Sequence, residues 1–319
     1  MAVYTHLSFS DIADLLSQYN IGKLLSFANI ESGTENSNYF ITTNQNKFVL
    51  TIYEKRVKKE DLPFYLKLMN HLKSQDILCP TPLKTKDNHL LYHIKNKPCA
   101  IISFLPGKSV TNIQNNHLAK LGKIIALMHN SSLNFTDKIA NHFSLNSWVD
   151  LFKQIESKVD KIKPGISQEI VKTLELLAKK WPTNLPSGII HGDLFPDNVF
   201  FENDEISGII DFYFSCYDFF MYDIAICLNA WCFEAGGEFN ITKAKLLLTN
   251  YNKVRTITES ELEALPILAS GAALRFLLTR LYDNINKTDD ALVKLKNTLE
   301  YLQKLRFHQN IISHAEYGL

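Results

Sequence analysis

The chain has 319 residues, 46% of them hydrophobic, which is enough apolar material for a large core and about two domains. Its 34 basic and 33 acidic side chains leave a formal net charge of +1, so the charge favours neither nucleic acid nor an anionic membrane as a partner. The five cysteines form no CxxC pair, which is typical of reduced, buried thiols. Because no signal-peptide pattern begins the chain, we expect a cytoplasmic protein.

The first hundred residues have the pattern of a small antiparallel sheet. Ser8 followed by Asp11 predicts a capping box that opens a short helix. Strands are expected at 24–30, 38–43, 47–53, 90–94 and 100–104. A helix is expected at 60–72, where Leu62, Leu66 and Met69 recur at helical spacing.

Pro106 and Gly107 mark the point along the chain where the predicted secondary structure changes. Beyond them the apolar spacing is mainly helical, at 117–129, 147–159, 168–181 and through most of 243–306. Short strands at 189–190, 199–201 and 206–210 interrupt these helices. The sequence therefore predicts an α+β protein of two lobes, a small N-terminal antiparallel sheet lobe at 1–104 and a larger, mainly helical lobe at 105–319, with a hinge at about 103–107.

The most informative motif lies among these short strands. Asp193 and Asn198 fall between two of them, and a predicted hairpin then returns the chain to Asp211. Such a loop and hairpin can direct two carboxylates and one amide to a single site. Hard oxygen donors of this kind suit Mg²⁺, which takes one or two protein carboxylates together with water and phosphate.

With His191, these residues form the H-x-D-x-x-x-x-N loop and the D-F pair of kinase-like phosphotransferases. In that chemistry Asp193 would orient an acceptor hydroxyl and take its proton, while Asn198 and Asp211 would hold the metal that bridges the nucleotide phosphates. Any one of these residues could instead cap a turn, a common role of Asp and Asn. All three at this spacing favour catalysis.

Three further polar residues are expected to support the loop. His191 is interpreted as a loop-stabilising residue, because the chain has no G-x-S-x-G elbow for a catalytic triad. Asp218 and Asp223 lie in an apolar segment beyond the motif. One of them is expected to be a helix N-cap and the other a buried hydrogen-bond partner of the catalytic loop, in preference to metal binding.

With these residues in place, the chain resembles the aminoglycoside phosphotransferase/choline kinase superfamily and, within it, the homoserine kinase branch. The resemblance runs nearly end to end, at 35–38, 49–56, 61–64, 102–105, 191–201, 209–216, 223–233 and 273–282. It implies a two-lobed, protein-kinase-like fold. It also implies ATP-dependent phosphorylation of the L-homoserine hydroxyl to O-phospho-L-homoserine, a step of threonine biosynthesis.

By the same resemblance, ATP with Mg²⁺ would bind between the lobes, its adenine beside the hinge strand near Ser103 and Leu105. The polar turn that includes Asn36 and Ser37 could fold over the phosphates, although an ordinary hairpin turn is the alternative. One departure is Thr51, where the superfamily usually has a phosphate-pairing Lys or Arg. Lys47 shares its face by alternation, and which cation neutralises the phosphates stays open.

L-Homoserine carries a carboxylate and an ammonium, so its site should offer a cation and an anion or carbonyls. Arg275 or Arg280 is the hypothesised clamp for the carboxylate. The two lie about 140° apart around a helix, so only one can face a given site. Asn229 or Trp231 would line that site. For each arginine the alternative role is a bridge between helices.

Two other interpretations stay open. The same fold could act on choline, thiamine, methylthioribose or an aminoglycoside, although the mildly acidic segment 218–223 argues against cationic acceptors. A catalytically silent binding module would lack Asp193, Asn198 or Asp211, and all three are present. The sequence predicts no particular oligomeric state.

Overall fold

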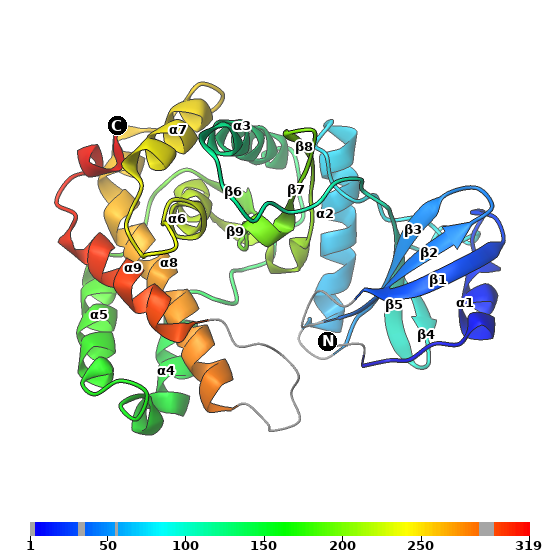
Figure 1. Cartoon of the computed structure of the whole chain (residues 1–319), viewed down its shortest axis with the longest axis horizontal. Helices are drawn as coiled ribbons and strands as arrows, with labels where there is room; N and C mark the ends of the chain where they lie inside the picture. The colour runs from blue at the N-terminus through cyan, green and yellow to red at the C-terminus, as the bar shows by residue number, and fades with distance from the viewer. Residues whose placement is uncertain (1–3, 31–35, 55–56, 287–296) are drawn as a thin grey trace. The chain divides into compact units, whose positions relative to one another are not determined.

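The computed structural model describes residues 4–30, 36–54, 57–286 and 297–319 (Figure 1). The chain divides into two compact units. The first comprises Met1–Lys108, Phe200–Glu202 and Ser207–Tyr213, and the second comprises Ser109–Val199, Asn203–Ile206 and Phe214–Leu319. A single cut near Leu105 does not describe these units, because most of the later hairpin groups with the first one.

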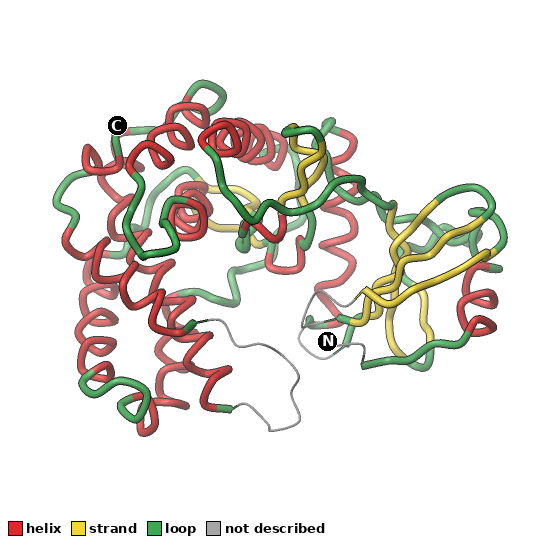
Figure 2. Tube along the Cα trace, in the orientation of Figure 1, coloured by secondary structure: helices red, strands yellow, loops and turns green. Residues whose placement is uncertain are grey.

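Five strands form the sheet of the first unit, each antiparallel to its neighbours, in the order β1-β2-β3-β5-β4. Figure 1 labels these strands, and Figure 2 draws strands in yellow. They are β1 (Leu24–Ile30), β2 (Ser37–Thr43), β3 (Lys47–Ile52), β4 (Tyr92–Ile94) and β5 (Lys97–Ser103). Every strand expected here is confirmed to within three residues at its ends. β3 occupies the centre, between β2 and β5.

Helix α1 (Phe9–Leu16) packs on one face of this sheet. It begins with the predicted capping box between Ser8 and Asp11. Its apolar side chains share a buried core with Leu50 of β3. Because side chains alternate along a strand, the neighbouring Thr51 points to the opposite face.

Helix α2 (Leu62–Ser74) starts two residues later than expected, because the preceding turn forms the 3₁₀ helix η1 (Lys59–Asp61). Pro63 lies in the first turn of α2, where a missing N–H removes no intrahelical hydrogen bond.

The predicted linker is bound to the hairpin formed by β7 (Val199–Glu202) and β8 (Glu205–Ile209). The backbones of Lys108 and Phe201 exchange two hydrogen bonds, of 3.1 and 2.9 Å. Ser207 Oγ donates to the Pro106 carbonyl at 2.7 Å. Residues 106–108 therefore belong to the first unit, and the chain leaves that unit only after Lys108.

The second unit is mainly helical, as expected. Its helices are α3 (Asn115–Ser132), α4 (Leu145–Val159), α5 (Ile166–Lys180), α6 (Phe220–Trp231), α7 (Ile241–Asn252), α8 (Glu259–Ile285) and α9 (Thr298–Asn310). Helix α8 packs against α4, α5, α6 and α9. Among the described helices, α8 alone is long and apolar enough to cross a membrane by length and composition, yet 61% of that stretch is buried inside the structure, as in a core helix.

No range was predicted for two elements near the catalytic motif, although a helix N-cap was expected at Asp218 or Asp223. Strand β9 (Cys216–Phe219) pairs antiparallel with β6 (Ser187–Ile190), and α6 follows it directly. All residues of α6 except Ala230 are buried. A helix that is apolar on every side has no 3.6-residue period, and β9 is too short for alternation to be recognised.

A histidine is buried where α9 meets the C-terminal 3₁₀ helix η4 (His314–Tyr317). The rings around His308 are those of Phe233, Phe239, Phe307 and Tyr317. His308 Nδ1 lies 2.8 Å from the Tyr317 hydroxyl, whereas its Nε2 has no hydrogen-bond partner. Burial, and then the charge of Lys304, lower the pKa of His308 to about 3, so the folded protein holds it neutral.

We expect the free energy of unfolding to fall as the pH drops below about 6.5, the ordinary pKa of histidine. Between that value and the folded pKa of about 3, the unfolded chain binds a proton that folded His308 does not, so stability is lost with acid. Urea unfolding at several pH values should give a shallower decline between pH 7 and 5 in His308→Gln than in wild type. His6→Gln, at an exposed position, is the control. Equal slopes in wild type and His308→Gln would contradict this expectation.

Candidate active site

The loop between β6 and the 3₁₀ helix η2 (Pro196–Asn198) brings Asp193 and Asn198 together. Asn198 Nδ2 donates to the Asp193 main-chain carbonyl at 2.8 Å and to its Oδ2 at 3.2 Å. Asn198 is buried, whereas Asp193 is partly exposed. Because the amide nitrogen faces Asp193, the amide oxygen of Asn198 is the end left for a cation.

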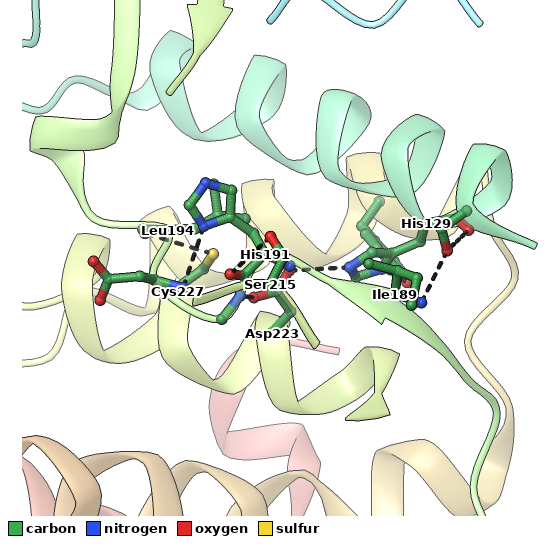
Figure 3. Close-up of polar contacts among 11 residues, drawn as sticks. His129, Ile189, His191, Leu194, Ser215, Asp223 and Cys227 are labelled. Carbon is green, nitrogen blue, oxygen red and sulfur yellow. Dashed lines mark hydrogen bonds and ion pairs between the residues drawn. The ribbon is translucent and has the colours of Figure 1, made fainter. Parts of the chain in front are cut away.

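A buried carboxylate holds the start of this loop (Figure 3). Asp223 of α6 is fully buried and accepts hydrogen bonds from the backbone N–H groups of His191 and Gly192, each at 2.9 Å. Its Oδ2 also lies 3.1 Å from His129 Nε2 of α3. Of the two aspartates singled out from the sequence, Asp223 is therefore the buried partner of the loop.

Asp223 is ionised and His129 is neutral. Burial by itself would raise the pKa of Asp223, but the hydrogen bonds from His129 and the His191 N–H hold it below its ordinary value. Burial lowers the pKa of His129 against the pull of Asp223. A neutral His129 protonated on Nε2 donates to Asp223, and its Nδ1 accepts from the Tyr251 hydroxyl at 2.8 Å. Sequence reasoning missed His129, because a histidine on the buried face of a helix has no distinguishing pattern.

The backbone carbonyls of the loop are held by side chains from two helices. Arg275 of α8 donates from Nη1 to the Gly192 carbonyl at 2.8 Å, and Trp231 of α6 donates from Nε1 to the Leu194 carbonyl at 2.8 Å. Gly192 has φ +76°, and a Cβ there would lie 2.6 Å from the Phe214 carbonyl oxygen, so only glycine fits this turn. Both faces of the loop backbone are thus fixed.

The remaining residues expected around the acceptor also have partners within the protein. Asn229 is fully buried and donates to the carbonyls of Ala225 and Ala269, both at 3.0 Å, which connects α6 to α8. Arg280 pairs with Glu300 of α9 at 2.8 Å. The geometry of Arg275, Trp231, Asn229 and Arg280 is that of bridges between elements of the second unit.

Neither Asp218 nor Asp223 is the N-cap of α6, which is Phe219, so the N-cap expectation is wrong. Asp218 Oδ1 accepts from the Phe219 N–H at 2.7 Å, and its Oδ2 accepts from Asn141 Nδ2 at 2.7 Å. Burial raises the pKa of Asp218. Asp218 therefore connects the loop that contains Asn141 to the end of β9 through a hydrogen bond.

Asp211 belongs to the first unit and lies two residues after the end of β8. Its backbone has φ +66°, in the left-handed region that Asp adopts at lower cost than most residues. The residue is exposed, and the 3₁₀ helix η3 (Phe212–Phe214) follows it. Strained backbone that carries a polar side chain is found preferentially at ligand-binding and catalytic positions.

The hydroxyls of Ser37 and Ser103 are both used within the first unit. Ser37 Oγ accepts from the Thr5 N–H at 3.1 Å and donates to Glu54 at 2.7 Å. Ser103 Oγ accepts from the Thr81 N–H at 2.9 Å. The Ser37 hydroxyl is thus fully used by its protein partners, whereas the Ser103 hydroxyl accepts one hydrogen bond and keeps its own proton to donate.

The other two residues expected near the nucleotide are also packed. Asn36 is buried, and its Oδ1 accepts from the Glu54 N–H at 3.4 Å. The Leu105 side chain packs on Gly208 of β8, where a Cβ would lie 2.5 Å from Leu105 Cδ1. Residues 32–35 of the expected phosphate loop lie outside the described residues.

Among the described residues, no three His, Cys, Asp or Glu side chains gather into a metal-binding group. The oxygen donors of the motif are the Asn198 amide and the Asp193 carboxylate in the second unit, and the Asp211 carboxylate in the first. A set of few, hard oxygen donors fits Mg²⁺ better than a transition metal, which prefers imidazole or thiolate.

Comparisons with known proteins agree with this chemistry. The model of the phosphotransferase enzyme family matches residues 26–257. The chain is 49% identical over 319 residues to the homoserine kinase of Rhizobium rhizogenes, a match that covers 100% of this chain and 99% of that protein. The homoserine kinase of Parvibaculum lavamentivorans is also 49% identical, with the same coverage.

Solved structures give the same fold at much lower identity. An amicoumacin kinase in complex with AMP-PNP superposes with a TM-score of 0.70 at 15% identity, covering 94% of this chain and 92% of that one. The choline kinase of Cryptosporidium parvum gives 0.68 at 15% identity, covering 95% and 94%. Fold and loop thus define a phosphotransferase of the protein-kinase-like class. The chain belongs to the phosphotransferase enzyme family.

We expect Asp223→Asn to loosen the catalytic loop without altering the residues that the loop carries. The amide would turn its NH₂ group toward a backbone N–H and leave a buried donor unpaired, which costs about 1–3 kcal/mol. Turnover should fall about tenfold or more, because small displacements of catalytic groups are costly. ADP release and thermal unfolding would measure both effects. Asp197→Asn, at an exposed position in the same loop, is the control. Wild-type turnover in Asp223→Asn would show that the loop does not depend on this carboxylate.

Proposed function

We propose that this protein phosphorylates the hydroxyl of L-homoserine with ATP, giving O-phospho-L-homoserine and ADP for threonine biosynthesis. The observation that carries the proposal is the 49% identity to curated homoserine kinases over essentially the full length of both chains. Membership of the phosphotransferase family, and the hydrogen-bonded pair of Asp193 and Asn198, support the reaction type.

Asp193 is proposed as the catalytic base. Its carboxylate accepts the proton of the acceptor hydroxyl as that oxygen bonds to the γ-phosphorus and the bond from this phosphorus to the bridging oxygen of ADP breaks. The partial exposure of Asp193 lets a substrate reach it, and the hydrogen bond from Asn198 fixes its orientation. Phosphoryl transfer depends mainly on such positioning.

Asn198 and Asp211 are proposed as protein ligands of Mg²⁺. The Asn198 nitrogen is used on Asp193, so its oxygen is the end that suits a hard cation. Asp211 contributes an exposed carboxylate from a strained turn. When bound, the ion neutralises charge on the nucleotide phosphates.

The nucleotide contacts are proposed to come from backbone atoms. The adenine would be recognised by main-chain groups from Ser103 to Leu105, while the Ser103 hydroxyl accepts a hydrogen bond from the Thr81 N–H. The main chain at Asn36 and Ser37 would lie beside the phosphates. Recognition by main-chain atoms suits ATP, a nucleotide that many different enzymes bind.

For the homoserine carboxylate, Arg280 is the proposed partner in preference to Arg275, because its side chain is 12% exposed whereas Arg275 is 3% exposed, and substrate binding there would replace the ion pair of Arg280 with Glu300. Arg275, Trp231 and Asn229 are assigned to support of the loop and of helix packing. A cytoplasmic location is part of the proposal, and five free, buried cysteines support it. The proposal includes no nucleic acid, membrane or particular oligomeric state.

The function is tested by ADP release with Mg²⁺-ATP and a panel of acceptors: L-homoserine, L-serine, choline, thiamine and kanamycin. We expect turnover with L-homoserine at least about tenfold above the others, because one hydrogen-bonded or charged group usually gives discrimination of that order. Higher turnover with another acceptor would keep the phosphotransferase chemistry and reject homoserine as the substrate.

Asp193→Asn should lower kcat by about two orders of magnitude or more while nucleotide affinity stays close to that of wild type, because it removes an interaction made mainly in the transition state. Single-turnover phosphorylation and ATP titration by calorimetry would separate the two quantities. Asp197→Asn again provides the matched control. Wild-type kcat in Asp193→Asn would mean that another group is the base.

A further inference from the structure

The central strand of the sheet lacks an ion pair that protein kinases use. In those enzymes a lysine of the third strand pairs with a glutamate of the following helix, and both must be in place for activity. Here the strand position is Thr51, which is 3% exposed. Helix α2 contains no Asp or Glu. Lys47, at the other end of β3, lies 5.9 Å from the ring of Phe104.

Tyrosine side chains connect the end of β3 to α2 and to η3. Tyr53, directly after β3, and Tyr213 of η3 share a hydrogen bond of 3.0 Å between their hydroxyls, and their rings meet edge to face at 5.2 Å. By alternation along β3, Thr51 lies on the same face of the sheet as Tyr53. Tyr65 of α2 packs edge to face on Tyr213 at 5.8 Å. We call Tyr53, Tyr65 and Tyr213 the tyrosine cluster.

The cluster is part of the first unit and is tightly packed. Tyr53 is 1% exposed and Tyr65 is 4% exposed. A buried phenol that loses its partner is costly, and the shared hydrogen bond therefore fixes the position of Tyr213 relative to β3.

Tyr213 is only two residues from Asp211. The left-handed backbone at Asp211 is held from one side by β8, where the Ile209 N–H donates to the Leu78 carbonyl at 2.8 Å. Tyr213 holds it from the other side. A strained conformation persists only where the surrounding structure fixes it, so both attachments matter for the direction of the Asp211 carboxylate.

We propose that Tyr213 is a positioning residue for the Asp211 carboxylate, and that the tyrosine cluster makes the connection between β3, α2 and the Asp211 turn that an ion pair makes in protein kinases. This inference rests on the proposed function, in which Asp211 binds Mg²⁺. It explains why a threonine at position 51 is compatible with catalysis. The cluster makes this connection without a cation at position 51, where a lysine would bury a charge with no carboxylate on α2 to pair with.

The experiment compares Tyr53→Phe, Tyr213→Phe and the double variant, all of which keep the rings and remove only hydroxyls. ADP release at saturating ATP and L-homoserine is measured against Mg²⁺ concentration. We expect each single variant to raise the Mg²⁺ concentration for half-maximal activity about threefold to tenfold, the range for the loss of one hydrogen bond. The double variant should be about as impaired as either single one, because both remove the same bond.

Tyr92→Phe, which removes a hydroxyl from exposed β4 of the same unit, is the control and should leave the metal dependence as in wild type. Metal-free ATP affinity should not change in any of the variants. Lower thermal stability of Tyr213→Phe with an unchanged Mg²⁺ dependence would overturn the inference, since packing alone would then explain the cluster.

Asp211→Asn separates this inference from the proposed function. A large rise in the Mg²⁺ requirement of Asp211→Asn, with none in Tyr213→Phe, would reject the role of Tyr213 and keep Asp211 as a ligand. Wild-type Mg²⁺ dependence in Asp211→Asn would reject Asp211 as a ligand, and the inference with it.

Discussion

The carboxylate of Asp223 is the interaction on which the catalytic loop depends. An ionised group with no exposure is tolerated only when its hydrogen bonds and charge are satisfied. Three N–H donors satisfy this one, two from the backbone at His191 and Gly192 and one from His129. Because the donors belong to the loop and to α3 while Asp223 belongs to α6, the same contacts that stabilise the charge also fix the loop between two helices.

The rest of the loop is fixed by side-chain donors to its carbonyls and by a glycine in a tight turn. Arg275 and Trp231 hold its carbonyls, and the left-handed turn at Gly192 allows the backbone to approach Phe214. Each of these contacts joins two residues of the second unit. A loop held at both its N–H and C=O groups is preorganised, and preorganisation is what phosphoryl transfer requires of a protein.

The sequence predicted the sheet well, because β1 to β5 have an alternating pattern or a polar turn beside them, and α1 has its capping box. It also predicted the Asp193 and Asn198 pair, since both residues fall in one short loop. It did not predict α6, whose burial on all sides removes any helical period, nor β9, which pairs with a strand far away in the chain. The clamp role given to Arg275 followed from its charge alone, and its partner, the Gly192 carbonyl, is a backbone atom that no side-chain pattern reveals.

The sequence by itself determined which residues are available for chemistry: an acid and an amide in one loop, a second acid after a hairpin, and a threonine in place of a cation. Local spacing is enough for this, because these residues are neighbours along the chain or across a short turn. Only the tertiary structure decided which groups hold them. Asp223 lies 31 residues from Gly192, Arg275 lies 83 residues from it, and Tyr213 lies 160 residues from Tyr53. Contacts at such separations depend on how whole elements pack, and packing is non-local.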